Sequence, residues 1–137
     1  MKVPDELPSA RKVLVLAAGG TISMTGDAGV VPELDGEELV AGVPGLAAYD
    51  GLEGKTVVNK PSAHLTLDDQ LDVCRQARDA ARRGTGVVVT HGTDSLEETA
   101  MLCDLLHDAE APIVFTGAIR PASAPGADGP ANLLDAV

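Results

Sequence analysis

Three runs of aliphatic and β-branched residues, each followed by a polar turn, constrain what this chain can fold into. The runs are Val13–Ala17, Gly86–Thr90 and Pro112–Thr116, and segments with helical periodicity precede and follow the second run. Because these runs are apolar without alternation, they are typical of strands covered on both faces, as in a parallel sheet. The alternation of strands and helices predicts an α/β fold, a three-layer sandwich around a mostly parallel, Rossmann-like sheet.

Weaker patterns between the first two runs predict further elements. A short helix is expected over Gly36–Val40, and a short strand over Lys55–Asn59. Thr66 and Asp69 have the spacing of a capping box, so they predict the start of a helix that ends near Gly84. Its buried face is expected to be an apolar stripe of Leu67, Leu71, Cys74, Ala77 and Ala81.

Two more helices follow the second and third runs. Asp94 or Ser95 can cap a helix that extends to about His107, and its many aliphatic residues predict that it is largely buried. The last helix is expected to begin at Asp128, with proline in its first turn. Its pattern continues to Val137 without a capping residue, so we expect the domain to be incomplete at its C-terminal end.

The domain organisation is expected to be simple. Residues 1–10 predict a flexible lead-in, and residues 11–137 a single α/β domain. The segment Met24–Asp35 is rich in glycine, aspartate and proline and has no period, so it predicts a mobile loop. Such a loop is either a lid over a site or a simple connection.

Composition excludes several functional classes. The net charge of -11 and the aromatic content of 1% argue against a nucleic-acid partner, which needs basic and stacking side chains. No apolar stretch approaches the ~18 residues that a membrane span needs. Cys74 and Cys103 lie far apart without a CxxC motif and predict a buried, reduced pair. The N-terminus lacks the features of a signal peptide, so a cytoplasmic protein is expected.

Threonines follow the first two strands where glycine turns the chain. Thr21 and the pair Thr93-Asp94 should lie at the carboxyl edge of the sheet, where open α/β sheets bind ligands. A threonine hydroxyl needs a base or a charged neighbour to act as a nucleophile, and Asp94 could hold a substrate ammonium group or orient such a base. Helix capping by itself would also select Thr-Asp-Ser at a helix start, so this alternative stays open.

Cofactor and metal sites are not indicated. The chain contains no phosphate-binding GxxxxGK[ST] motif, and Gly19, Gly20 and Gly26 have the wrong spacing for a dinucleotide fingerprint. The three histidines lack partners at metal-ligand spacing, which favours structural or solvated roles. His91 directly follows a strand and could lie near the site.

Four segments of the chain resemble those of bacterial-type L-asparaginases. They are Ala17–Ser23 (AAGGTIS), Gly86–Ala100 (GVVVTHGTDSLEETA), Thr116–Pro121 (TGAIRP) and Ala127–Leu133 (ADGPANL). The resemblance extends over nearly the whole chain from Arg11. It implies hydrolysis of a side-chain amide, with asparagine as substrate and glutamine as a second candidate substrate, and no cofactor or metal. It also implies that the chain is the N-terminal part of the large catalytic domain.

The resemblance implies a role for each matching residue. Thr21 matches the acylated nucleophile, and Thr93 and Asp94 match the second threonine and its carboxylate neighbour. Asp94 would receive the substrate α-ammonium group. Ser62 matches a contact to the substrate carboxylate, and Ala118 would offer a backbone contact near the leaving amide.

The sequence departs from the family pattern at several points. The family has a lysine that pairs with the Thr93 and Asp94 positions, and no lysine follows Lys60 here. The smaller C-terminal domain, which completes the site of a neighbouring subunit in the family's homo-oligomers, is also absent. Gly29 stands where many members carry a loop tyrosine, and Ala63 stands where several carry glutamine. We therefore expect these 137 residues by themselves to have little or no amidase activity.

Two other functions remain open at this stage. One is the ammonia-generating amidase subunit of a tRNA-dependent amidotransferase, although such subunits usually carry an extra N-terminal domain. The other is a non-catalytic amino-acid-binding or interaction module that keeps the pocket without the chemistry.

Overall fold

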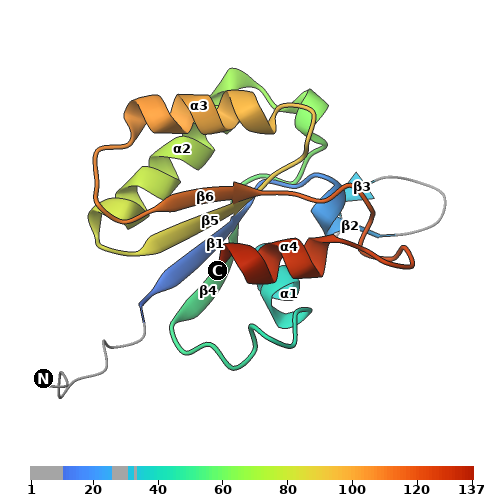
Figure 1. Ribbon diagram of the computed structural model, residues 1–137. Coiled ribbons are helices and arrows are strands. Elements are labelled where there is room, and N and C mark those ends of the chain that lie inside the picture. Colours follow the sequence, from blue (N-terminus) through green and yellow to red (C-terminus); the bar gives the residue numbers. More distant parts are fainter. Residues whose placement is uncertain (1–10, 26–30, 33) are drawn as a thin grey trace, which may run out of the picture.

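The protein has a four-stranded parallel sheet at its centre, as the sequence predicts (Figure 1). The computed structural model describes residues 11–25, 31, 32 and 34–137. The strands are β1 (Val13–Ala17), β4 (Leu52–Thr56), β5 (Gly86–Thr90) and β6 (Ile113–Thr116), in the spatial order β4-β1-β5-β6. The central strand, β1, pairs in parallel with both β4 and β5. The expected lead-in, residues 1–10, lies outside the described residues.

Helices cover both faces of the sheet and complete the three-layer sandwich (Figure 1). On one face lie α2 (Leu67–Arg82) and α3 (Leu96–Leu106), and on the other α1 (Gly36–Ala41) and α4 (Gly129–Ala136). Alternate β1 residues point to opposite faces, which separates two apolar cores. Val13, Val15 and Ala17 pack in the core with Leu39 of α1 and Leu133 of α4. The other core contains Leu16, Val87, Val89, Val73, Cys74, Ala77 and Cys103.

The helix ends largely follow the expected sequence signals. Thr66 and Asp69 form the predicted reciprocal capping box at the start of α2, and Gly84 follows the end of α2 with φ +80°. Helix α1 covers the expected Gly36–Val40 and extends one residue further to Ala41, with Gly42 as its C-cap. Cys74 and Cys103 are buried and free, as expected. None of the helices within the described residues is both long and apolar enough to cross a membrane.

Strand β4 begins and ends three residues earlier than the expected Lys55–Asn59. The strand consists of Leu52–Thr56, paired residue by residue with Val13–Ala17 of β1. The backbone N–H groups of Val57 and Val58 then both donate to Ala17 O as the chain leaves the sheet. The register with β1 therefore decides the bounds of β4, and Val57 and Val58 lie just beyond the strand.

The predicted burial of α3 was wrong, and the predicted buried stripe of α2 was confirmed for Cys74, Ala77 and Ala81 but not for Leu67. Met101 and Leu105 of α3 are 58% and 70% exposed, because α3 packs against α2 along one side and the described residues leave its other face uncovered. Leu67, the expected first member of the α2 stripe, is 64% exposed. The buried face of α2 consists of Val73, Cys74, Ala77, Ala80 and Ala81.

The segment Met24–Asp35 is not wholly a loop. Its ends form two short antiparallel strands, β2 (Met24–Thr25) and β3 (Val31–Pro32). Strands of two residues are too short to give a periodic signal, so the sequence pattern could not reveal them. Residues 26–30, which include Gly29, lie outside the described residues.

Candidate active site

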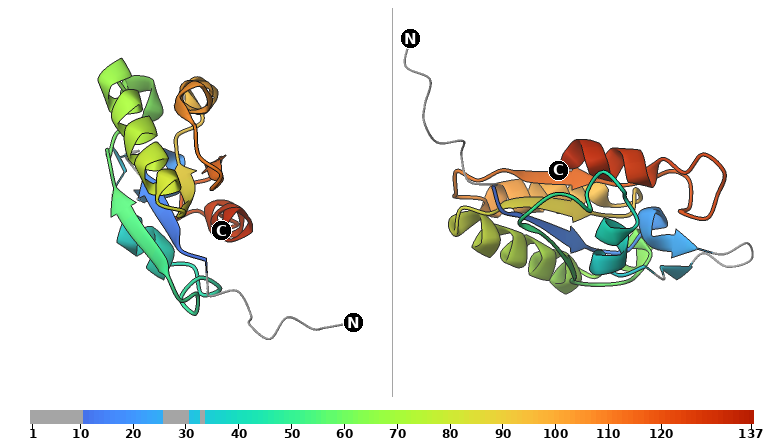
Figure 2. Two further views of the ribbon diagram at one scale, coloured as in Figure 1. Left: turned by 90° about the vertical axis from the view of Figure 1, so that its left-hand side faces the viewer. Right: turned by 90° about the horizontal axis from the view of Figure 1, so that it is seen from below.

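The five predicted site residues lie on loops at one edge of the sheet. The four parallel strands end in register, with Ala17 beside Thr56 and Thr90, and Thr90 beside Thr116. The loops that follow the strands therefore meet at their carboxyl ends (Figure 2). This arrangement brings together the segments that carry Thr21, Ser62, Thr93-Asp94 and Ala118.

Two glycines allow the Thr21 loop to touch both neighbouring loops. Gly19 and Gly20 have φ values of +77° and +85°, a backbone region that L side chains rarely adopt. A Cβ atom at Gly19 would lie 2.3 Å from Lys60 O, and one at Gly20 would lie 2.3 Å from Gly92 Cα. The Gly-Gly pair is therefore required by close backbone packing, and Thr21 and Thr93 directly follow the Gly20–Gly92 contact.

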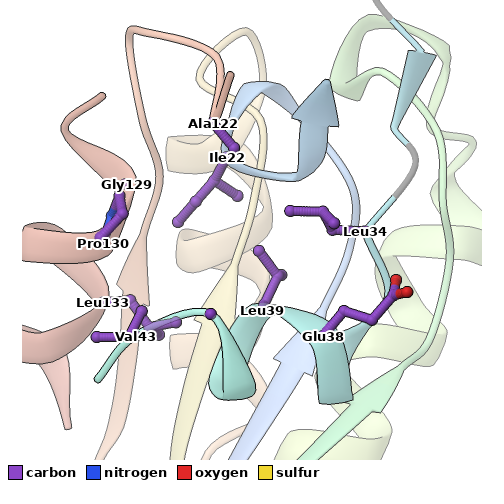
Figure 3. A pocket seen from close by; sticks show the side chains of 10 residues that line it. Ile22, Leu34, Glu38, Leu39, Val43, Ala122, Gly129, Pro130 and Leu133 are labelled. Atoms are coloured by element: carbon purple, nitrogen blue, oxygen red, sulfur yellow. The ribbon is translucent and has the colours of Figure 1, made fainter. Parts of the chain in front are cut away.

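A buried apolar side chain, which lines a pocket beside the turn, anchors the Thr21 turn. The turn is a 3-10 helix over Thr21–Ser23, in which Ile22 is buried. Ile22, Leu34 and Leu39 converge on a cavity of about 140 Å³ between this turn and helices α1 and α4 (Figure 3). The cavity lining contains none of the predicted site residues. Ile22 is thus an anchor on one side of Thr21, which itself is half-buried.

Ser62 and Asp94 form a direct contact between two of the loops. The Asp94 backbone N–H donates to Ser62 Oγ over 3.1 Å, and Ser62 Oγ donates to Asp94 Oδ2 over 3.3 Å. Ser62 is 3% exposed, whereas Asp94 is exposed. An accessible carboxylate can bind the ammonium group of an amino acid, and the buried Ser62 hydroxyl holds this carboxylate in place.

Helix capping does not explain the Thr-Asp-Ser sequence. Ser95 occupies the N-cap position of α3, but its side chain makes no capping hydrogen bond. Its hydroxyl donates to Ser62 O over 3.0 Å instead. Asp94 and Ser95 both direct their side chains to Ser62, so these two polar groups serve the contact between loops.

The Ala118 loop is held from the start of α4. Asp128 accepts hydrogen bonds from the backbone N–H groups of Ile119 and Arg120, at 2.9 and 2.8 Å, and these donors lower the pKa of its carboxyl. Asn132 Nδ2 donates to Gly117 O over 2.9 Å. Ala118 lies between these anchors and is buried. Asp128 thus restrains the loop and makes no side-chain capping bond to α4.

His91 is a buried residue whose side chain forms a hydrogen bond with the Thr93 loop. Its side chain is fully buried, and Nδ1 donates to Gly92 O over 2.8 Å. Burial lowers the pKa of the imidazole, which favours the neutral form. The structural role that the sequence favoured for His91 fits this position.

An ion pair fixes the chain just before Ser62. Lys60 Nζ lies 2.8 Å from Asp69 Oδ2, and the Thr66 backbone N–H donates to the same oxygen over 2.9 Å. The Lys60 ammonium, followed by the Thr66 N–H, lowers the pKa of Asp69 from 3.8 to about 2. Asp69 therefore links the loop that touches Gly19 to the first turn of α2.

This lowered pKa predicts an acid-dependent contribution to stability. The folded state favours the Asp69 carboxylate, so its contribution is present above pH 3.8 and is lost as the pH falls toward about 2. In Asp69→Asn, we expect this component of the pH dependence to disappear, measured as the denaturant midpoint between pH 2 and 6. Asp68→Asn, in the same helical turn and exposed, is the matched control. Parallel pH profiles for wild type and Asp69→Asn would contradict the assignment.

The candidate site consists of hydroxyls, one carboxylate and main-chain groups. Among the described residues, no three His, Cys, Asp or Glu side chains gather in a way that could hold a metal ion. Threonine hydroxyls can act as nucleophiles when a base or a charged neighbour activates them, and a carboxylate can hold a cationic group.

Comparison with protein families shows to which family the chain belongs. The family model described as "Asparaginase, N-terminal" matches residues 12–137. The chain belongs to the asparaginase family.

Individual members of the family show what share of an asparaginase this chain covers. It is 44% identical to probable L-asparaginase 4 of Schizosaccharomyces pombe over 133 residues, and 37% identical to L-asparaginase 2 of Escherichia coli over 130 residues. Each match covers 91% of this chain and 37% of the relative. The crystal structure of a probable cytoplasmic L-asparaginase from Campylobacter jejuni matches with a TM-score of 0.83 and 32% identity, over 92% of this chain and 40% of that one. The chain thus corresponds to the N-terminal part of the asparaginase fold.

Some residues that build the site escaped the sequence analysis. The side chain of Ser95 was expected to cap a helix, and the buried Thr99 was not singled out. A polar residue four positions after Ser95, within an apolar helical stretch, is the available signal for Thr99. Gly92 could have been identified from its place in the second strand-ending turn, opposite Gly19-Gly20.

Proposed function

We propose that the protein carrying this chain hydrolyses the side-chain amide of L-asparagine to L-aspartate and ammonia. The observation that carries the proposal is the paired contact between Ser62 and Asp94 beside the Gly20–Gly92 approach. These contacts hold Ser62 against Asp94 of the Thr93 loop, and that loop against the Thr21 loop. Membership in a family whose named members are L-asparaginases supports the same substrate.

Thr21 is the nucleophile in this proposal. Its Oγ attacks the side-chain carbonyl carbon of asparagine, the C–N bond breaks, and ammonia leaves with the proton that the hydroxyl gives up. Water then attacks the Thr21 ester, which releases aspartate and restores the hydroxyl. The position of Thr21 supports this role, because Gly20 and the anchored Ile22 hold the residue on both sides.

The other site residues bind and orient the substrate. Asp94 takes the α-ammonium group, Ser62 contacts the α-carboxylate, and Ala118 offers its backbone near the leaving amide. Thr93 provides the second hydroxyl. Thr93 lies beside the Ala118 loop, since a Cβ atom at Gly117 would be 3.5 Å from Thr93 Cγ2.

The proposal also covers the compartment and the assembly of the protein. The relatives include a protein named cytoplasmic in Campylobacter jejuni and one named periplasmic in Haemophilus influenzae. We place this protein in the cytoplasm, where its two free thiols, Cys74 and Cys103, would stay reduced. A homo-oligomer, with glutamine as a possible second substrate, completes the proposal.

Replacing the Asp94 charge tests the function. In the native protein at its full encoded length, we expect Asp94→Asn to lower kcat/KM for asparagine roughly 10- to 100-fold, the equivalent of one charge-assisted hydrogen bond. Ammonia release from asparagine and glutamine, together with calorimetric titration by aspartate, provides the measurement. Asp50→Asn, in the exposed turn before β4, is the matched control.

The outcomes separate the candidate functions. Ammonia release by the wild type, with the loss confined to Asp94→Asn, supports the amidohydrolase. Aspartate binding without ammonia release would overturn the proposal and favour a non-catalytic amino-acid-binding module. Ammonia release that requires a partner subunit would favour the amidotransferase alternative.

A further inference from the structure

A series of hydrogen bonds joins the first turns of helices α2 and α3 to the candidate site. Gln70 Nε2 of α2 donates to Thr99 Oγ1 of α3 over 3.0 Å, and Thr99 Oγ1 donates to Ser95 O over 3.2 Å. The Ser95 hydroxyl then donates to Ser62 O over 3.0 Å. Gln70, Thr99 and Ser95 form what we call the interhelical chain. Through Ser95, which accepts at its carbonyl and donates from its hydroxyl, the interhelical chain connects Gln70 on α2 to Ser62.

Thr99 is the central member of the interhelical chain. Its side chain is fully buried. A helical threonine commonly satisfies its hydroxyl on the carbonyl four residues earlier, as Thr99 does on Ser95. Here the same oxygen also accepts from Gln70, and Thr99 O accepts from the Cys74 thiol at 3.5 Å. Two groups of α2 therefore hold this turn of α3 in place.

Ser95 connects this turn of α3 to the candidate site through a hydrogen bond to Ser62. Because its hydroxyl donates to Ser62 O, the position of the first turn of α3 sets the position of the Ser62 backbone. Ser62 Oγ in turn accepts from the Asp94 N–H and donates to its carboxylate. A shift of Ser95 would therefore change the distance between the two groups that face the substrate.

We propose that Gln70 and Thr99 are positioning residues that fix Ser62 relative to Asp94 for recognition of the substrate α-amino and α-carboxylate groups. This inference rests on the proposed function. These substrate groups do not react, so contacts to them are the same in the ground state and the transition state. Loss of the interhelical chain should therefore raise KM and leave kcat nearly unchanged.

The test compares Thr99→Val with Thr99→Ser in the full-length native protein. Valine keeps the shape and removes the hydroxyl, whereas serine keeps the hydroxyl. We expect Thr99→Val to raise KM for asparagine about tenfold, the equivalent of one hydrogen bond, with kcat within about twofold of the wild type. Thr99→Ser should restore most of the affinity. If Thr99→Val folds poorly, Gln70→Leu takes its place in the test. This variant removes the donor from α2 and should also raise KM.

A matched control separates positioning from stability. Val87→Ala, on β5, opens a cavity in the apolar core that also contains Cys74. Val87 is not a member of the interhelical chain. This variant should lower the unfolding midpoint without raising KM. Equal KM values for Thr99→Val, Thr99→Ser and Val87→Ala would overturn the positioning role.

Hydrogen exchange gives a readout that does not depend on catalysis. The Asp94 amide proton, which donates to Ser62 Oγ, should exchange faster in Thr99→Val than in Thr99→Ser. Unchanged exchange in Thr99→Val would overturn the inference even if the protein is an active asparaginase. Failure of the wild type to release ammonia would overturn the proposed function, and the exchange rates would still decide whether Thr99 restrains Asp94.

Discussion

Replacing Thr21 by alanine is expected to reduce asparagine hydrolysis in the full-length protein at least about a thousandfold, the scale seen when a catalytic nucleophile is removed. Alanine cannot form the ester, so both half-reactions are lost. The turn itself should survive, because it is closed by the backbone bond from Ser23 N to Gly20 O and anchored by buried Ile22. Steady-state ammonia release measures the effect.

The same prediction separates the nucleophile from its surroundings. Thr21→Ser keeps a hydroxyl and should retain measurable activity, whereas Thr85→Ala, in the loop before β5, should behave as the wild type. Aspartate binding to Thr21→Ala should persist, because Ser62 and Asp94 are untouched. Activity of Thr21→Ala within tenfold of the wild type would exclude Thr21 as the nucleophile.

Replacing Gly20 by alanine is expected to give the largest loss of stability. Alanine at φ +85° is strained, and its Cβ would lie 2.3 Å from Gly92 Cα and 2.4 Å from Gly92 N. These are backbone atoms that cannot rotate away, so the two loops would have to separate. We expect a cost of about 3 kcal/mol or more in unfolding free energy, with loss of activity, measured by denaturant titration.

Gly84 provides the control for this substitution. Gly84 has nearly the same φ, +80°, but a Cβ atom there would have no neighbour within 4 Å. Gly84→Ala should therefore cost only about 1 kcal/mol, from backbone conformation alone. The difference between the two variants reflects the contact between the Thr21 and Thr93 loops together with the strain of alanine at the Gly20 ψ of −179°. Equal costs would show that this contact contributes nothing to stability.

The sequence predicted the central elements of the fold because their signals are local. Val13–Ala17 is apolar throughout and Gly86–Thr90 is apolar up to its final threonine, and the structure confirms both strands. The capping box of Thr66 and Asp69 is a pattern within one helical turn, and it too is present. Signals of this kind depend on the chain's own neighbours and need no knowledge of the tertiary structure.

The wrong predictions depended on contacts between distant segments. The bounds of β4 follow from its register with β1, which lies about forty residues earlier. The exposure of Met101 and Leu105 follows from where α3 packs on α2. Such facts depend on which surfaces meet, and periodicity within one segment cannot supply them.

The candidate site was predicted in part. The topology of parallel strands correctly placed the loops of Thr21 and Thr93-Asp94 at one edge of the sheet. The resemblance to asparaginases added Ser62 and Ala118, which no local pattern indicates. The interhelical chain from Gln70 to Ser62 could not be predicted, because it joins residues on separate elements.

The central claim is that Thr21, and not Thr93, forms the covalent intermediate. Its most direct test is to quench the full-length protein with acid during turnover of asparagine and to map the acyl group by peptide mass spectrometry. We predict an aspartyl ester on the peptide that contains Thr21, absent in Thr21→Ala and present in the Thr85→Ala control. An ester on the peptide that contains Thr93, or turnover without any acylated peptide, would contradict the account.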